Sequence, residues 1–159
     1  NQSDIFEYHS EPINAKNVPE NLKGLRTMFL SFHHFQPKNA KMILQNAINS
    51  NQPIAVLEIQ DRSLPSIVAM LLSPVSVLFT TPFIRPFRWS RLFFTYLIPI
   101  VPFVVLWDGI VSALRTYTVE EMRNLINSLE NNTAFEWNFN KKKSKTGFVI
   151  YTIGIPKKQ

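Results

Sequence analysis

Two adjacent imidazoles are the side chains of this sequence best suited to chemistry. They follow a short apolar run within residues 26–36 (RTMFLSFHHFQ), where Ser31 and Phe32 precede His33 and His34. An imidazole titrates near neutral pH and serves as a general base or acid. The carboxyl end of a buried strand is also where an open α/β sheet binds its ligand. We therefore predict a site at this point, with two histidines on a solvated sheet edge as the alternative.

The elements around the histidines have the pattern of a parallel strand–helix–strand unit. A strand is predicted at 28–31, and Pro37 suits the first position of a helix because its missing N–H costs nothing there. The run 53–59 (PIAVLEI) is apolar throughout, as in a strand covered on both faces. We expect 26–31 to run parallel beside 53–59 with one sheet edge open. The helix between them has a periodic apolar stripe of Ala40, Ile43, Leu44, Ala47 and Ile48.

The two ends of the chain add further elements. Residues 4–9 (DIFEYH) alternate as a half-buried strand does. Thr118 and Glu121 have the spacing of a capping box, which predicts a helix through about Leu129. The segments 134–140 and 148–154 flank the sequence KKKSKTG and are predicted to pair as an antiparallel hairpin.

An unusually apolar region interrupts this pattern. Residues 66–84 and 92–107 are almost free of charge, and IRPFRWSR separates them. Each is marginal in length for a membrane span, which needs about 20 residues, and prolines interrupt both. We favour a pair of helices that cap a cleft or form a dimer contact. The alternative is a shallow hairpin in a membrane interface, with Trp89 at headgroup level and anionic lipid bound by Arg85, Arg88 and Arg91.

Composition restricts the chemistry further. The 159 residues have 45% hydrophobic and 18% charged content and a net charge of +6, which fits one folded domain. There is no cysteine, so disulfides, thiolate metal sites and a cysteine nucleophile are excluded, and no metal site is predicted. A partner nucleic acid is disfavoured because neither basic cluster has the interleaved aromatic and Gly pattern of an RNA-binding sheet. The simplest interpretation of the lysine cluster is a solvated turn containing Lys141, Lys142, Lys143 and Lys145.

Five segments, taken by their order along the chain, resemble the carboxyl-terminal two thirds of a class I S-adenosylmethionine-dependent methyltransferase. RTMFLSFHHF resembles the fourth strand with its histidine-containing end, and PKNAKMILQNAINSNQPIAVLEI resembles the next helix and the fifth strand. EPINA, LRTYTVEEMRNLI and FEWNFNKKKSKTGFVIYTIGIPKK resemble the segment after the third strand, the late helix and the terminal hairpin. The resemblance implies an α/β fold over a single domain, 1–159. Its sheet would be partial and Rossmann-like, with parallel strands, a terminal antiparallel hairpin and a hydrophobic helical insertion at 64–107.

The resemblance also implies roles for particular residues. S-adenosyl-L-methionine would lie against Asn14, Ala15, Ser31, Phe32 and His33, with His34 as the general base toward the acceptor. Asn14 stands where the family commonly has Asp, and an ordinary turn residue is the alternative interpretation.

The acceptor pocket is predicted further along the chain. Its residues would be Glu58, Trp107, Asp108, Arg115 and Tyr117. Asp61 and Arg62 are weaker candidates, since such a pair is commonly a solvated cap. An ion pair between Asp108 and Arg115 is expected because an unpaired carboxylate is costly in so apolar a region.

The chain departs from the family where the cofactor would be held. Its glycines, Gly24, Gly109, Gly147 and Gly154, are too scattered for a Gly-rich loop, and the acidic residue that would hold the ribose is missing. The chain starts at Asn1 without a signal-peptide pattern, so we expect it to be a fragment of a longer protein. We predict that it is inactive alone and binds the cofactor weakly or not at all.

The sequence therefore predicts methyl transfer to a small, lipophilic acceptor by the complete enzyme. The alternative is a non-catalytic membrane-surface or partner-binding module with a degenerate methyltransferase fold. We expect a cytoplasmic location, which would be peripheral on the inner face of a membrane if the protein is membrane-associated. A homodimer is a further possibility that the sequence leaves open.

Overall fold

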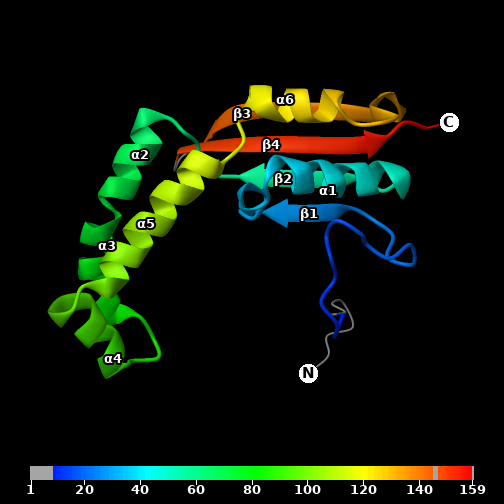
Figure 1. Ribbon diagram of the computed structural model, residues 1–159. Coiled ribbons are helices and arrows are strands. Elements are labelled where there is room, and N and C mark those ends of the chain that lie inside the picture. Colours follow the sequence, from blue (N-terminus) through cyan, green and yellow to red (C-terminus); the bar gives the residue numbers. More distant parts are fainter. Residues whose placement is uncertain (1–8, 145–146, 159) are drawn as a thin grey trace.

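The protein is a mixed α/β structure built on an open four-stranded sheet (Figure 1). The computed structural model describes residues 9–144 and 147–158. The strand order is β1-β2-β4-β3. The strands are β1 (Arg26–Phe29), β2 (Ile54–Glu58), β3 (Phe135–Ser144) and β4 (Gly147–Pro156).

The strand pairing confirms the predicted parallel pair and the predicted antiparallel hairpin. β1 and β2 are parallel, with Met28 opposite Val56. β4 pairs antiparallel with β2, with Thr152 opposite Val56, and antiparallel with β3, with Thr152 opposite Phe139. β1 is left as an edge strand, as expected.

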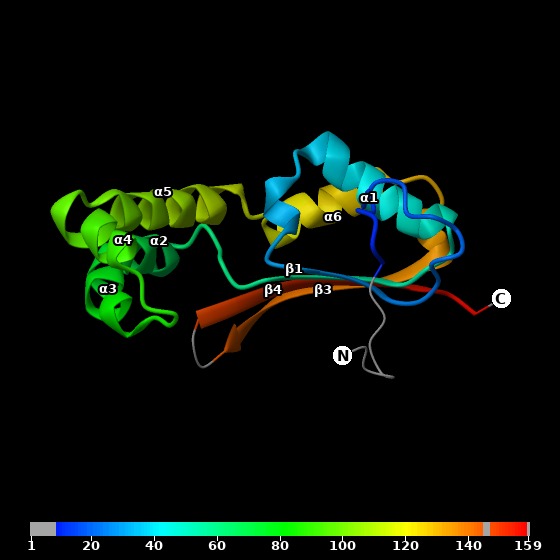
Figure 2. The ribbon, with the colours of Figure 1, turned by 90° about the horizontal axis from the view of Figure 1, so that it is seen from below.

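Two helices cover one face of this sheet (Figure 2). α1 (Pro37–Asn49) begins with the predicted proline, and α6 (Val119–Asn127) begins with the predicted capping box. The Thr118 hydroxyl accepts from the Glu121 amide at 3.1 Å, and the Thr118 amide donates to the Glu121 carboxylate at 2.9 Å. The core between helices and sheet consists of Phe32, Ala40, Ile43, Leu44, Ala47, Ile48, Ile54, Val56, Met122, Ile126, Leu129 and Phe135.

The opposite face of the sheet has no helix over it within the described residues (Figure 2). Phe29 and Ile155 are 62% and 53% exposed. Their register positions place them on the side away from Met28, Val56 and the core. An apolar sheet face of this kind normally packs against another layer.

The remaining helices form an arm that projects beyond the end of the sheet (Figures 1 and 2). Residues 64–115, hereafter the arm, extend past the predicted limit of 107 because α5 continues without a break. Most of the arm projects away from the sheet instead of lying over it as a cap, and the alternative of a dimer contact stays a prediction (Figures 1 and 2). Its helices are α2 (Leu64–Leu71), α3 (Ser73–Thr80), η2 (Thr81–Phe83), α4 (Trp89–Leu92), η3 (Phe93–Leu97) and α5 (Ile100–Arg115).

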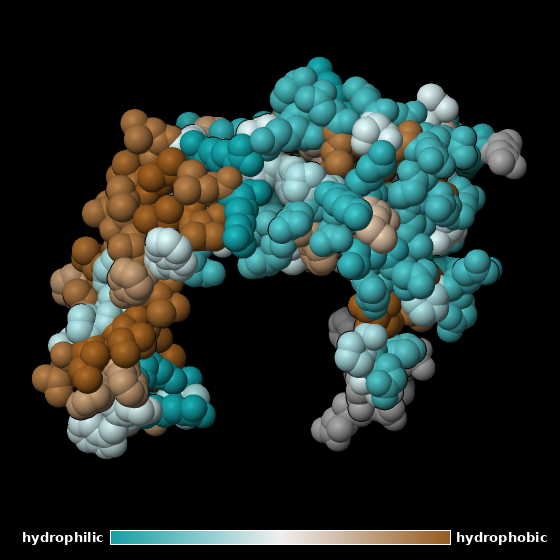
Figure 3. Space-filling model, viewed as in Figure 1, coloured by the Kyte–Doolittle hydropathy of each residue, from teal (hydrophilic) through white to brown (hydrophobic). Residues whose placement is uncertain are grey.

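The surface of the arm is strongly apolar (Figure 3). Of the 29 large hydrophobic side chains exposed in the described residues, 21 belong to residues 64–107. The segment Leu64–Phe83 is long and apolar enough to cross a membrane by length and composition. Trp89–Leu97 and Ile100–Arg115 pass the same test only together, and they meet at a bend of 76°.

Two further predictions concern the ends of the chain. The prediction that the lysine cluster is a solvated turn is wrong for Lys141, which lies in β3. Its ammonium group forms an ion pair with the buried Asp61 and lies 4.1 Å from the centre of the Phe148 ring. The strand predicted at 4–9 lies outside the described residues except for His9, which is not in a strand.

Candidate functional site

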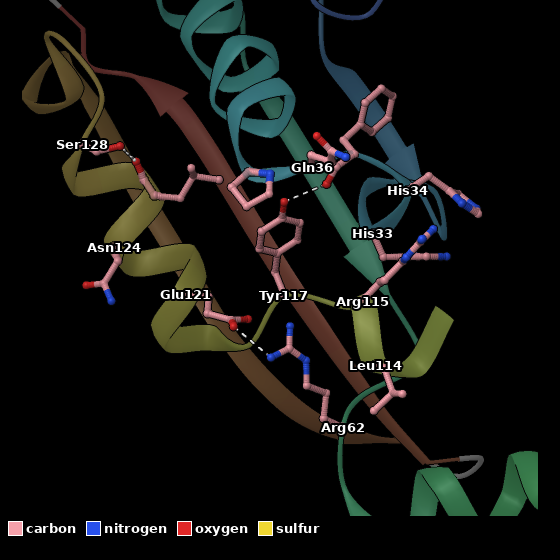
Figure 4. A pocket seen from close by; sticks show the side chains of 13 residues that line it. His33, His34, Gln36, Arg62, Leu114, Arg115, Tyr117, Glu121, Asn124 and Ser128 are labelled. Carbon is pink, nitrogen blue, oxygen red and sulfur yellow. Dashed lines mark hydrogen bonds and ion pairs between the residues drawn. The ribbon is translucent and has the colours of Figure 1, made fainter. Parts of the chain in front are cut away.

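A cavity of about 730 Å³ opens at the carboxyl ends of β1 and β2 (Figure 4). Its walls come from η1 (Phe32–His34), the start of α1, the end of α5 and one face of α6. This is the sheet end at which the sequence predicts a ligand site. The lining residues are His33, His34, Phe35, Gln36, Pro37, Arg62, Leu114, Arg115, Tyr117, Glu121, Asn124, Leu125 and Ser128.

A buried carboxylate fixes the chain and one imidazole at the end of β1. Glu58 is 4% exposed, and its Oε1 accepts hydrogen bonds from the amides of Phe32 at 2.8 Å and His33 at 3.2 Å. Its Oε2 lies 2.9 Å from His33 Nδ1. Leu30, with φ at 51°, makes the sharp change of direction from β1 into this turn. Glu58 therefore holds η1 and the His33 ring with a single side chain.

The contact with Glu58 determines what the other His33 nitrogen can do. A carboxylate only accepts, so the proton of a neutral His33 is on Nδ1 and Nε2 carries the lone pair. Nε2 is buried and has no hydrogen-bond partner among the described residues. A base oriented by a third group is the usual arrangement in general-base catalysis.

His34 has a different environment. Its side chain is exposed, and its ring centre lies 4.2 Å from that of His33. No described side chain fixes its orientation by a hydrogen bond. His34 therefore lines the cavity at its solvent side, whereas His33 is held inside.

Tyr117 lies in the middle of the cavity wall (Figure 4). Its hydroxyl donates to the Phe35 carbonyl at 2.7 Å, and its ring packs against Phe32 with centres 5.4 Å apart. Burial, with a smaller effect of the Glu121 carboxylate, raises the pKa of Tyr117, so the phenol stays protonated and acts as a donor. Tyr117 thus joins the start of α6 to η1.

Two cations and one anion give the cavity its charge. Arg62 pairs with Glu121 at 2.9 Å. Burial acts to raise the pKa of Glu121, but the hydrogen bond from the Thr118 amide and the contact with Arg62 outweigh it, so the pKa is lowered. Arg115 forms no ion pair within the described part of the chain, so its charge is available to an anionic group.

The structure brings together four residues of the predicted site, His33, His34, Arg115 and Tyr117, in the lining of one cavity. The weaker candidate Arg62 lines the same cavity. Three others support it without lining it. Glu58 holds His33 instead of facing an acceptor, Ser31 precedes η1, and Phe32 is fully buried in the core.

The remaining predicted residues lie elsewhere. Asn14 Oδ1 accepts from the Lys16 amide at 3.0 Å, which is the ordinary turn interpretation, and Ala15 packs at the edge of the core. Trp107 and Asp108 are exposed on the arm and do not line the cavity. The expected ion pair between Asp108 and Arg115 is absent from the described structure, because seven residues along α5 separate them by about 10 Å.

One face of α6 was missed as part of the site. Glu121, Asn124, Leu125 and Ser128 all line the cavity. Their spacing of three, one and three residues puts them on a single helical face. This spacing was the available signal, but three of the four residues are polar, so the face does not stand out from a solvated surface.

Neither a protein-family model, nor a curated protein, nor a solved structure matches this chain.

Two of the residues predicted to hold S-adenosyl-L-methionine, Asn14 and Ala15, lie away from the cavity. Both lie in a turn that does not reach it, and the glycines are dispersed. Gly109 packs in the arm and Gly154 lies under the Trp137 ring, so neither could form part of a cofactor loop.

Proposed function

We propose that this chain forms the acceptor-side part of an S-adenosylmethionine-dependent methyltransferase with a lipophilic acceptor. One observation carries the proposal: a cavity at the carboxyl ends of two parallel strands contains an imidazole that Glu58 orients and whose Nε2 has no partner. A positioned base assists methyl transfer by taking the proton of a hydroxyl or amine acceptor.

The sheet supports the Rossmann-like part of this proposal. The segments that resemble the fourth and fifth strands are β1 and β2, which lie side by side and parallel. The segment that resembles the terminal hairpin is β3 and β4, added antiparallel beyond β2. The β1 edge, where a first strand would pair, has no neighbouring strand among the described residues, and Phe29 is exposed on the uncovered face.

The side chains of the cavity have distinct parts in this proposal. His33 Nε2 accepts the proton of the acceptor's hydroxyl or amine, and Glu58 is a positioning residue that fixes the tautomer. Arg115 and Arg62 bind an anionic portion of the acceptor, while Phe35, Leu114 and Leu125 contact an apolar portion. The base is thus His33, in place of His34.

A methyl-transfer assay on the full-length product of the gene tests the proposal. The protein is incubated with S-adenosyl-L-methionine labelled on the methyl group and with a cell extract separated into organic-soluble and aqueous fractions. We expect label to enter a molecule of the organic fraction. Label that enters only the aqueous fraction, or no transfer at all, would contradict the proposal.

Calorimetry on the 159-residue chain tests whether it binds S-adenosyl-L-methionine by itself. Because Asn14 and Ala15 lie away from the cavity and the glycines are dispersed, titration with S-adenosyl-L-methionine is expected to give weak binding or none. Micromolar affinity would show that this chain holds the cofactor by itself.

The second candidate is a non-catalytic membrane-surface or partner-binding module. The exposed apolar surface of the arm favours it, since a surface this apolar usually has a partner. This second candidate predicts that the protein binds a membrane or a partner but transfers no methyl group in the assay above.

A further inference from the structure

The arm is built with its apolar side chains outward. α2 and α3 contain no buried residue. The buried residues of the arm are instead small or polar: Thr81, Thr95, Pro102, Gly109, Ser112 and Ala113. A water-exposed helical unit buries its large apolar residues, whereas helices that contact lipid place small residues between them and large apolar ones outside.

Close packing between the legs of the arm follows the same rule. A Cβ at Gly109 would lie 2.7 Å from Met70 Sδ, so α2 and α5 approach each other because this residue has no side chain. Small residues at helix contacts are the main means by which helices associate in lipid.

Four hydroxyl groups of the arm donate to carbonyls within the arm, whereas the buried Ser73 hydroxyl has no partner among the described residues. Thr80, Thr81 and Thr95 each donate to the carbonyl four residues earlier, at 2.7 Å. The Tyr96 hydroxyl donates to the Leu78 carbonyl. Polar groups in an apolar medium need such internal partners because water does not reach them.

The charges show how deeply the arm could enter a bilayer. No charged residue occurs between Arg62 and Arg85. The return leg, which is α4, η3 and α5, has only the uncharged residues 92–107 before Asp108. Because Gly109 packs against Met70, Asp108 lies level with the end of α2. The return leg is also bent by 76° between Trp89–Leu97 and Ile100–Arg115. Sixteen residues give at most about 24 Å of helix, less than the ~30 Å hydrocarbon core.

The far end of the arm carries residues typical of a membrane interface. Arg85, Arg88 and Arg91 lie in and beside the loop between η2 and α4, and Trp89 is 78% exposed. In Figure 3 the hydrophilic patch at this end lies on the side of the arm turned toward the N-terminal part of the protein, and the brown surface lies on the outer side. Arginine and tryptophan at the edge of an apolar surface match the anionic and interfacial layer of a membrane.

From these observations we infer that the arm enters one leaflet of an anionic phospholipid bilayer as a monotopic hairpin. Its apolar surface contacts the acyl chains, and Arg85 and Arg88 return to the phosphates of the same leaflet. Leu114 and Arg115 belong both to the arm and to the cavity wall, so the cavity opens near the headgroups. This inference does not depend on methyl transfer.

Cysteine labelling tests insertion and depth, because the chain has no cysteine of its own. Single variants Phe79→Cys, Ser90→Cys and Asn127→Cys report on the apolar surface, the far end of the arm and α6. Each is treated with a membrane-impermeant maleimide, with and without sealed vesicles of phosphatidylcholine and phosphatidylglycerol. We expect vesicles to protect Phe79→Cys at least tenfold, while the other two are labelled from outside without detergent.

Three results would overturn the inference. Equal labelling of Phe79→Cys with and without vesicles would mean that the arm does not enter lipid. Protection of Phe79→Cys in the absence of vesicles would mean that a second copy covers the surface. Labelling of Ser90→Cys only after detergent would mean that the arm crosses the bilayer.

Flotation with the same vesicles provides matched controls. Phe79→Asp with Phe83→Asp should abolish flotation, whereas Phe29→Asp should not, although Phe29 is also 62% exposed. Arg85→Glu with Arg88→Glu should weaken binding to anionic vesicles at least tenfold. Lys142→Glu with Lys157→Glu changes the net charge equally and should have a much smaller effect; equal effects would contradict the proposed contact.

Discussion

At the scale of single residues, Glu58 is central to the site because three donors converge on its carboxylate. Glu58→Ala should lower the free energy of unfolding by about 2–4 kcal/mol, since two buried amides lose their acceptor. Glu58→Gln should cost less, because its carbonyl oxygen still accepts from those amides. Urea unfolding measures both, and ¹⁵N chemical shifts of the His33 ring should show the Nε2 lone pair in the wild type only. An unchanged tautomer in Glu58→Gln would contradict the positioning role.

Asp61 gives a prediction for acid stability. Burial acts to raise the pKa of Asp61, but the bonds from Lys141 and Ser63 outweigh it and the folded-state pKa is lowered. The stabilisation is therefore present above the unfolded-state pKa of about 3.9 and is lost as the pH falls through the lower folded value. Asp61→Asn should be less stable than the wild type at pH 6, with the difference shrinking at pH 3. The exposed Glu120→Gln serves as the control, and a difference independent of pH would refute this account.

At the scale of elements, the hairpin depends on one close approach. A Cβ at Gly154 would lie 2.5 Å from the Trp137 ring, and a ring held against a sheet has little freedom to move. Gly154→Ala should lower the free energy of unfolding by about 1–3 kcal/mol. In a Trp137→Leu background the same change should cost less, and urea unfolding of all four proteins measures the coupling. Additive effects would mean that the ring does not set the limit.

The capping box sets the start of α6 and with it one wall of the cavity. Thr118→Ala removes the acceptor for the Glu121 amide and should lower the free energy of unfolding by about 1 kcal/mol. Thr133→Ala is a matched control because Thr133 is exposed. Similar losses in the two variants, measured by thermal or urea unfolding, would argue against the cap.

At the scale of the whole molecule, local patterns predicted the sheet domain well. Pro37, the apolar run 53–59 and the pair Thr118 and Glu121 are each a signal made by residues close together in the chain, and the three elements that they predict are confirmed. The site was predicted in part. Four lining residues lie near strand or helix ends, but the role of Glu58 depends on a contact 25 residues away in sequence, which no local pattern reveals.

The errors come from the same source. Asp108 and Arg115 were paired because both border apolar sequence, but helical rise keeps them apart. Three consecutive lysines predict a solvated turn, while the alternation of β3 turns Lys141 toward Asp61 and Phe148. The apolar composition of the arm predicts a cap over a cleft or a dimer contact, and no local pattern indicates that the arm projects outward from the sheet (Figure 1).

The comparison of His33→Gln with His34→Gln in the full-length protein tests the central claim most directly. Both variants remove one imidazole from the same cavity, but only His33 is oriented by Glu58. With labelled S-adenosyl-L-methionine and the organic-fraction acceptor, His33→Gln should lower kcat by about 100-fold or more, the usual contribution of a general base. His34→Gln should retain most of the activity. Equal losses in the two variants, or full activity in His33→Gln, would contradict the proposed site.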